Sequence, residues 1–416
     1  MFNEILARHP RATVLTFSAG SAEAQLSGSA GPDRPAATVQ LVLPRPVTRR
    51  GGVLLAPAAL FSQGMFAYVT VGPEAVTVER SGCVITLPLN GGSACLDSGE
   101  PLVPALEVLS RLNVDYEFSG GVCRVIVEAR SSGPRKLTPA EEALPYAKYY
   151  RRYWATPYHE RADFKSWAKK APLYAGGNMQ PPEAMLHLSQ VNKLMDRSYR
   201  ENEWREGWTL FDDGSGVMCA RTEFPGVTAE MFQWWFAWHV LEDLRYMLWC
   251  PPSHYGIAPA LDLRCRVKNP RLSLFEKTHG CAVHHVYESI NVDALSWDAA
   301  APVDYFDIPF HDPQYRGFTP ENVARFEREG ITAICGADRM LHFFAENADG
   351  SGGVCYTHFW YGVKRDAQGR WVGVKEGKNY DLLPPIMSIA QHANKEFPLL
   401  AEILPELYAE EGGKPL

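Results

Sequence analysis

A histidine and a glutamate four positions apart, His392 and Glu396, lie in an apolar run near the C-terminal end of the sequence. Residues three and four apart share one face of a helix, so both fall on a stripe with Ile389, Leu400 and Ile403. An ionised carboxylate in such a place needs a counter-charge, hydrogen bonds or a metal ion. The pair predicts either a metal site or an ion pair on a helix surface, and the apolar stripe favours the metal site.

A second candidate carboxylate lies in the run GCAVHHVYESINV, residues 280–292. The run alternates as a β-strand, which places Glu288 on the same side as Val286 and Ile290. Glutamate is mostly exposed in proteins, so a strand carboxylate facing solvent is the competing interpretation. The two apolar neighbours favour an inward Glu288, and Glu276 is the alternative carboxylate ligand.

The densest aromatic segment is PGVTAEMFQWWFAWHVLEDLRYMLWCPPSHYGI, residues 225–257. Thr228 is a suitable N-cap and two prolines follow Cys250, so we predict one helix of about six turns. Its aromatic face packs in the core or forms the walls of a pocket for a flat phenolic ligand. That face carries Phe232, Trp235, Phe236, His239, Tyr246 and Trp249.

Three polar residues of this segment are candidates for chemistry. His254 lies in the loop that follows the predicted helix, where an ordinary loop histidine is the alternative to a metal ligand. His239, on the aromatic face, is a competing ligand, although a packed or hydrogen-bonded histidine is more common there. The hydroxyl of a buried Tyr246 needs a partner, and a substrate carbonyl would be one.

The elements that must position these residues belong to an α+β chain. Short β-rich runs punctuated by Gly, Ser and Pro predict a small β-rich N-terminal domain at residues 1–132. A linker-like segment at 129–142 precedes a second domain, residues 133–416, that begins with a helical segment. Several antiparallel strands closed by one long C-terminal helix predict a helix-grip (START-like) fold with a cavity between sheet and helix.

Composition excludes several classes of protein. The chain has 416 residues, 46% of them hydrophobic, with a net charge of -7 and a pI near 6.0, which argues against a nucleic-acid partner. Nine scattered cysteines without a CxxC pair predict free thiols in the cytoplasm. No stretch approaches the length of a membrane span, and a homo-oligomer is left open.

Two resemblances organise these observations. The segment LVPALEVLSRLNVDYEFSGGVCRVIVE resembles the closing helix and hairpin of the copper amine oxidase N-terminal-like domain. His9 is the sole histidine before residue 159, so this resemblance does not imply copper. The blocks RTEFPGVTAEMFQWWFAWHVLEDLRYMLWCPPSHY, HHVYESI and HANKEFPLLAEILPELYAEE resemble, across roughly residues 137–412, the 2,4-diacetylphloroglucinol hydrolase and phloretin hydrolase family.

This family consists of zinc hydrolases that cut the carbon-carbon bond between a polyphenol ring and an acyl group and release a carboxylic acid. The resemblance implies a small phenolic ketone as substrate and a helix-grip catalytic domain with a hydrophobic tunnel. It also implies one zinc ion. The zinc ligands that it implies are His254, Glu288, His392 and Glu396.

The resemblance also implies roles for residues around the metal. Tyr246 matches a substrate-contacting tyrosine, and Tyr356 matches a second one approximately. The chain departs from the family at Ile257, where an asparagine is expected. We hypothesise that zinc supplies hydroxide and acts as a Lewis acid, while Tyr246 donates a hydrogen bond to the carbonyl. His239 or Tyr356 would then protonate the ring carbon.

Two other functions fit the same pattern. A metal-free helix-grip protein that binds polyketides or other hydrophobic ligands would have the same fold, and fold alone does not separate the two. A metallohydrolase acting on an ester or a β-diketone would share the site and differ in its substrate. Metal content separates the binding protein from the enzymes.

Overall fold

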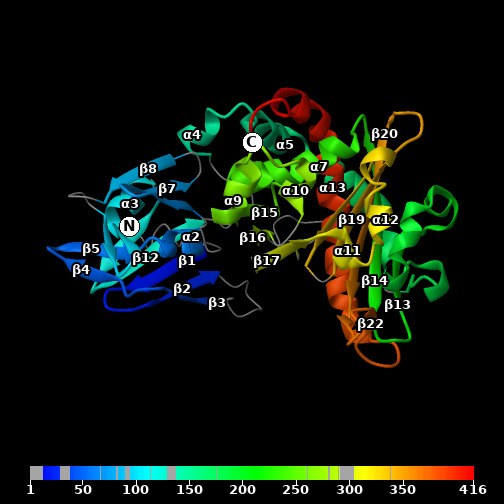
Figure 1. The fold of residues 1–416 in the computed structure, drawn as a ribbon, viewed down its shortest axis with the longest axis horizontal. Helices are drawn as coiled ribbons and strands as arrows, with labels where there is room; N and C mark the ends of the chain where they lie inside the picture. The colour runs from blue at the N-terminus through cyan, green and yellow to red at the C-terminus, as the bar shows by residue number, and fades with distance from the viewer. Residues whose placement is uncertain are drawn as a thin grey trace. The chain divides into compact units, whose positions relative to one another are not determined.

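The fold is described from a computed structural model of the chain (Figure 1). The chain divides into two compact units, and each is described by itself. The first comprises Met1–Trp154, Val240–Arg264 and His285–Phe306, and the second Ala155–His239, Cys265–His284 and Asp307–Leu416. The boundary that the sequence predicts between residues 132 and 133 lies outside the described residues. The described residues are 13–28, 38–65, 67–80, 83–89, 94–112, 114–128, 137–175, 177–259, 261–279, 282–288, 290, 304–337 and 339–416.

The N-terminal part of the first unit is β-rich, as predicted. Its sheets have the strand orders β11-β12-β1-β2-β3, β4-β5-β10-β9 and β6-β7-β8. Apolar residues that alternate along the strands, such as Val76 and Val78, face a core shared with Leu15, Phe17 and Phe61. The elements are β1 (Thr13–Ser18), β2 (Glu23–Gly28), β3 (Thr38–Val42), β4 (Thr48–Arg50), β5 (Val53–Pro57), α2 (Ala59–Met65), β6 (Tyr68–Val71), β7 (Ala75–Arg80), β8 (Cys83–Pro88), β9 (Cys95–Asp97), β10 (Glu100–Pro104), α3 (Ala105–Arg111), β11 (Tyr116–Ser119) and β12 (Val122–Glu128).

The largest sheet among the described residues has eight strands in the order β13-β14-β20-β19-β18-β17-β16-β15. The segment DDGSG, residues 212–216, supplies the turn of a hairpin, in which β13 and β14 pair antiparallel from Leu210 and Gly216 onward. The pairs β14–β20, β20–β19, β19–β18 and β18–β17 are also antiparallel. The strands are β13 (Gly207–Leu210), β14 (Gly216–Pro225), β15 (His254–Pro259), β16 (Ala282–Glu288), β17 (Asp304–His311), β18 (Ile331–Gly336), β19 (Met340–Glu346) and β20 (Gly352–Tyr361), and a separate hairpin pairs β21 (Val363–Arg365) with β22 (Trp371–Gly373).

The two faces of this sheet carry different side chains, because neighbours along a strand point to opposite sides. In the second unit, Phe343, Tyr356 and Trp360 belong to an apolar cluster on one face. The opposite face carries Phe344, which stacks on Phe232 with ring centroids 4.7 Å apart. The C-terminal helix α13 packs against β14 and β20 on this second face (Figure 1).

The long C-terminal helix is confirmed as α13, Leu383–Glu411, which has a proline in its first turn. Its predicted stripe is confirmed as well, because all five members are buried. Burying the three aliphatic members stabilises the helix by removing apolar surface from water. These members are Ile389, His392, Glu396, Leu400 and Ile403.

The single helix predicted after Thr228 is wrong. The segment forms α7 (Ala229–Trp238), a 3-10 turn η6 (His239–Leu241) and α8 (Asp243–Met247), because Glu242 is extended with φ -161 and ψ 143. The Glu242 carboxylate accepts a hydrogen bond from the Tyr146 hydroxyl and lies 3.6 Å from Arg245. Helix periodicity does not reveal such a break, since Tyr146 is distant in sequence.

The helical segment expected before the sheet is confirmed, and it consists of short helices. Among the described helices none is long and apolar enough to cross a membrane. The remaining helices are α4 (Pro139–Glu142), α5 (Ala147–Ala155), η1 (Tyr158–Glu160), α6 (Ala162–Lys170), η2 (Ala171–Tyr174), η3 (Pro182–Ala184), η4 (Leu188–Met195), η5 (Tyr199–Glu203), α9 (Leu261–Lys268), α10 (Leu274–Thr278), α11 (Pro313–Arg316), α12 (Pro320–Val323), η7 (Glu327–Glu329) and η8 (Tyr380–Leu382).

Candidate metal centre

His254 is the first residue of strand β15 and is fully buried. The sequence placed His254 in the loop after the helix, and that placement is wrong because the residue already belongs to β15. A turn after α8 leads into the strand, where the backbone N–H of His254 donates to the carbonyl of Cys250 at 2.8 Å. This backbone hydrogen bond fixes the start of β15, where the side chain of His254 is buried.

Contacts at one ring face and at both ring nitrogens define the orientation of His254. Its imidazole stacks on the Tyr246 ring, with centroids 4.3 Å apart and planes 5° apart. Nδ1 lies 3.4 Å from the backbone carbonyl oxygen of Tyr246, and Nε2 lies 3.3 Å from Oε2 of Glu288. A proton on Nδ1, next to the carbonyl, leaves the Nε2 lone pair available to a metal.

Glu288 ends strand β16, and its predicted inward direction is confirmed. His284, Val286 and Glu288 are all buried, as the alternation requires. The Tyr246 hydroxyl donates a hydrogen bond to Oε2 of Glu288. The alternative carboxylate, Glu276, instead caps helix α10, where it accepts from the Ser273 backbone at 2.8 Å.

His392 and Glu396 form a buried pair on one face of α13. Nε2 of His392 lies 3.4 Å from Oε2 of Glu396, and both side chains are about 5% exposed. Burial at this level makes an isolated charge costly, so the pair is either mutually neutralising or shared with a cation.

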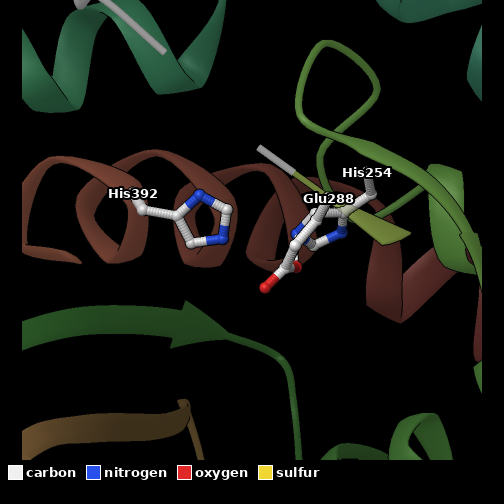
Figure 2. A group of neighbouring side chains, drawn as sticks. All are labelled: His254, Glu288 and His392. Atoms are coloured by element: carbon white, nitrogen blue, oxygen red, sulfur yellow. Dashed lines mark ion pairs between the residues drawn. The ribbon is translucent and has the colours of Figure 1, made fainter. Parts of the chain in front are cut away.

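One ligand atom from each of His254, Glu288 and His392 lies within 4.8 Å of the other two, and all three residues are buried (Figure 2). We call these residues the His-Glu-His trio. Two imidazoles and a carboxylate are the donors that zinc takes in hydrolytic sites. Glu396 is not a member of the trio, although it contacts His392.

The other predicted site residues lie outside the trio. His239 is buried, and its Nδ1 lies 2.7 Å from the carbonyl oxygen of Trp235. Tyr356 packs edge-on against Trp204, with ring centroids 5.1 Å apart, in the apolar cluster of the sheet face opposite α13. Ile257 is fully buried on β15.

Sequence reasoning missed His342, which lies on the sheet face covered by α13. It is buried on β19 directly opposite Thr357, whose Oγ1 is 3.2 Å from its Nδ1. Burial lowers the pKa of His342 to about 4, while the nearby Glu396 carboxylate opposes that shift and His392 adds to it. The imidazole is therefore neutral at pH 7. A histidine within the apolar run MLHFFAE was the available signal.

A buried trio of imidazole and carboxylate ligands, held by strands and a long helix of an α+β chain, defines the class of the protein as a candidate metalloenzyme. Residues 186–409 match the family model described as the DAPG hydrolase PhiG domain, and the chain belongs to this family. The resemblance inferred from the three sequence blocks is thus confirmed.

Two relatives illustrate the similarity. The phloretin hydrolase of Eubacterium ramulus is 31% identical over 281 residues, which are 65% of this chain and 92% of that protein. The 2,4-diacetylphloroglucinol hydrolase of Pseudomonas protegens is 26% identical over 289 residues, 64% of this chain and 85% of that protein. A solved structure of a quaternary ammonium Rieske monooxygenase aligns with a TM-score of 0.19 and 9% identity over 96% of this chain and 74% of that chain, which is too low to support an argument.

Proposed function

We propose that this protein is a zinc-dependent hydrolase that cleaves the carbon-carbon bond between a phloroglucinol-type ring and an acyl group. The single observation that carries the proposal is the buried His-Glu-His trio in a chain of this family. The names of two relatives, phloretin hydrolase and 2,4-diacetylphloroglucinol hydrolase, support phenolic ketones as the substrate class.

The residues present fit a zinc ion. His254, Glu288 and His392 would hold it, and Glu396, 3.4 Å from His392, would be the fourth ligand. A bound zinc ion lowers the pKa of water toward neutrality and polarises a carbonyl oxygen. The burial of all four side chains excludes bulk solvent and strengthens their interactions with a cation.

The proposed reaction adds water across one bond. The water oxygen joins the acyl carbon, the carbon-carbon bond to the ring breaks, and the ring carbon takes a proton, so the products are a carboxylic acid and the polyphenol. The ring in its keto form makes the leaving group an enolate rather than an aryl carbanion. Tyr246 is the proposed hydrogen-bond donor to the ketone. Its one hydroxyl proton, which is donated to Glu288 in the structure, would turn to the ketone oxygen when substrate binds.

The proton donor to the ring carbon is the remaining role. His239 and Tyr356 were the two predicted donors, and the position of Tyr356 on the sheet face opposite α13 favours His239. Nδ1 of His239 lies 2.7 Å from the Trp235 carbonyl oxygen, which favours a proton on Nδ1, so His239 would donate from Nε2 as the imidazolium, with its second proton taken from the reacting water.

The proposal includes a helix-grip catalytic domain, residues 133–416, and an N-terminal domain, residues 1–132, of the copper amine oxidase N-terminal-like type. The packing of α13 across β14 and β20 supports the helix-grip assignment. The eight described cysteines are free thiols, which supports our prediction of a reducing compartment such as the cytoplasm.

The test uses the full chain loaded with zinc and a panel of acylphloroglucinols and dihydrochalcones, with release of carboxylic acid as the readout. The matched variant is Glu288→Gln, which keeps the shape of the side chain and removes its charge. We expect acid release by the wild type and little by the variant. Zinc binding with turnover of esters or β-diketones alone would favour the alternative metallohydrolase, and ligand binding without any metal would favour a carrier protein.

A further inference from the structure

Asp243, the first residue of α8, is a buried carboxylate with a backbone partner on a neighbouring strand. It is 7% exposed, and its Oδ1 accepts a hydrogen bond from the backbone N–H of Ile257 in β15 at 3.0 Å. Placing a carboxylate in such surroundings is costly unless its hydrogen bonds offset the lost hydration. The hydrogen bond therefore holds β15 against α8 at Ile257.

Helix α8 contacts β15 at two points that are one helical turn apart. Asp243 holds Ile257, and the backbone carbonyl of Tyr246 lies 3.4 Å from Nδ1 of His254. Between them, the chain passes close to the carboxylate at Gly256, where a Cβ would lie 3.1 Å from Oδ1 of Asp243. A glycine at this position permits the close approach of strand and helix.

We propose that Asp243 is a positioning residue for the metal ligand His254. By holding β15 against α8, it keeps Nδ1 of His254 at the Tyr246 carbonyl and Nε2 directed at Glu288, 3.3 Å away. Residues that hydrogen-bond or pack against a metal ligand on the side away from the metal determine its tautomer and orientation. The inference rests on the proposed metal function of the trio.

The experiment measures zinc affinity of the full-length protein by competition with a chromophoric chelator. Asp243→Ala removes the acceptor, and we expect affinity to fall roughly 10- to 100-fold. Asp243→Asn keeps an Oδ1 acceptor and should restore most of it. The matched control is Asp349→Ala, which removes an exposed aspartate whose Oδ1 accepts from the Ser351 backbone at 3.0 Å and should leave affinity unchanged.

A spectroscopic measurement separates positioning from general destabilisation. The visible spectrum of the Co²⁺-loaded protein reports ligand geometry, and it should change in Asp243→Ala and not in Asp349→Ala. If Asp243→Ala does not fold, Gly256→Ala, which presses on the same carboxylate, should weaken zinc binding in its place.

The outcomes distinguish this inference from the proposed function. A folded Asp243→Ala protein, or Gly256→Ala if that alone folds, with wild-type zinc affinity and Co²⁺ spectrum overturns the positioning role and leaves the metal site intact. A wild-type protein that binds no zinc overturns both. Zinc binding that depends on Asp243, without hydrolysis of any phenolic ketone, supports the inference and contradicts the proposed function.

Discussion

The imidazole of His254 lies parallel to the phenol ring of Tyr246, with centroids 4.3 Å apart and planes 5° apart. The hydroxyl of the same tyrosine donates to Glu288. One side chain therefore contacts two members of the trio in two ways, through its ring face and through its oxygen. Removing only the oxygen separates these contributions.

Tyr246→Phe should keep the ring stacked on His254 and lose the hydroxyl. We expect kcat/KM for an acylphloroglucinol to fall roughly 10- to 100-fold, since a hydrogen bond to a charged partner contributes about 1.5–3 kcal/mol. Zinc affinity should also fall, because the hydroxyl is the hydrogen-bond partner of the proposed ligand Glu288. Steady-state kinetics with chelator competition measures both, and an unchanged kcat/KM would remove Tyr246 from the mechanism.

His392→Ala should reduce the zinc content of the purified protein, measured by elemental analysis. Loss of a ligand should lower zinc affinity by more than the roughly 10- to 100-fold that is typical when a residue contacting a ligand is mutated. His187→Ala is the control, because His187 lies outside the trio and pairs with Asp213 at 3.1 Å. Equal zinc in both variants would contradict the assignment of His392, and no zinc in the wild type would favour a carrier protein.

The stability of the second unit should decrease in acid because of His358. Burial lowers the pKa of His358 to about 3, and its Nε2 accepts from Nε1 of Trp204 at 2.9 Å. Its depressed folded pKa means that the unfolded chain takes up the proton first. Stability is therefore fully present above pH 6.5 and declines as pH falls toward 3, with a slope of at most about 1.4 kcal/mol per pH unit.

Urea unfolding between pH 4 and 7 checks this expectation. His358→Gln keeps an acceptor for Trp204 and does not titrate, so its stability should depend less on pH than that of the wild type. The same slope in both proteins would assign the acid sensitivity to other groups.

Thr228→Ala should destabilise helix α7 by about 1 kcal/mol, the usual cost of losing an N-cap. The Thr228 hydroxyl accepts from the backbone N–H of Met231 at 3.2 Å. Thr228→Ser keeps this oxygen and should stay near wild-type stability. Denaturant unfolding of the two variants makes the comparison, and equal stability of alanine and serine would show that the cap does not contribute.

Much of the site was predictable from periodicity and from resemblance together. The apolar stripe around His392 and Glu396 follows from helical spacing, and the inward Glu288 follows from strand alternation, and in each case burial in the structure agrees. Local signals are also informative, since Thr228 correctly marks the start of α7 and the DDGSG sequence is typical of the turn that joins β13 and β14. These features depend on neighbours within a few residues.

Other features depend on partners that are distant in the sequence. The helix expected after Thr228 is broken at Glu242, which contacts Tyr146, and His342 is neutral because sheet and helix bury it. Tyr356, which the resemblance matched only approximately to a substrate-contacting tyrosine, faces away from α13 because of the register of β20. By itself the sequence determined which residues face inward on each element, since that is a matter of period; only the tertiary structure decided which of them meet, since strand register and helix breaks arise from contacts between distant segments.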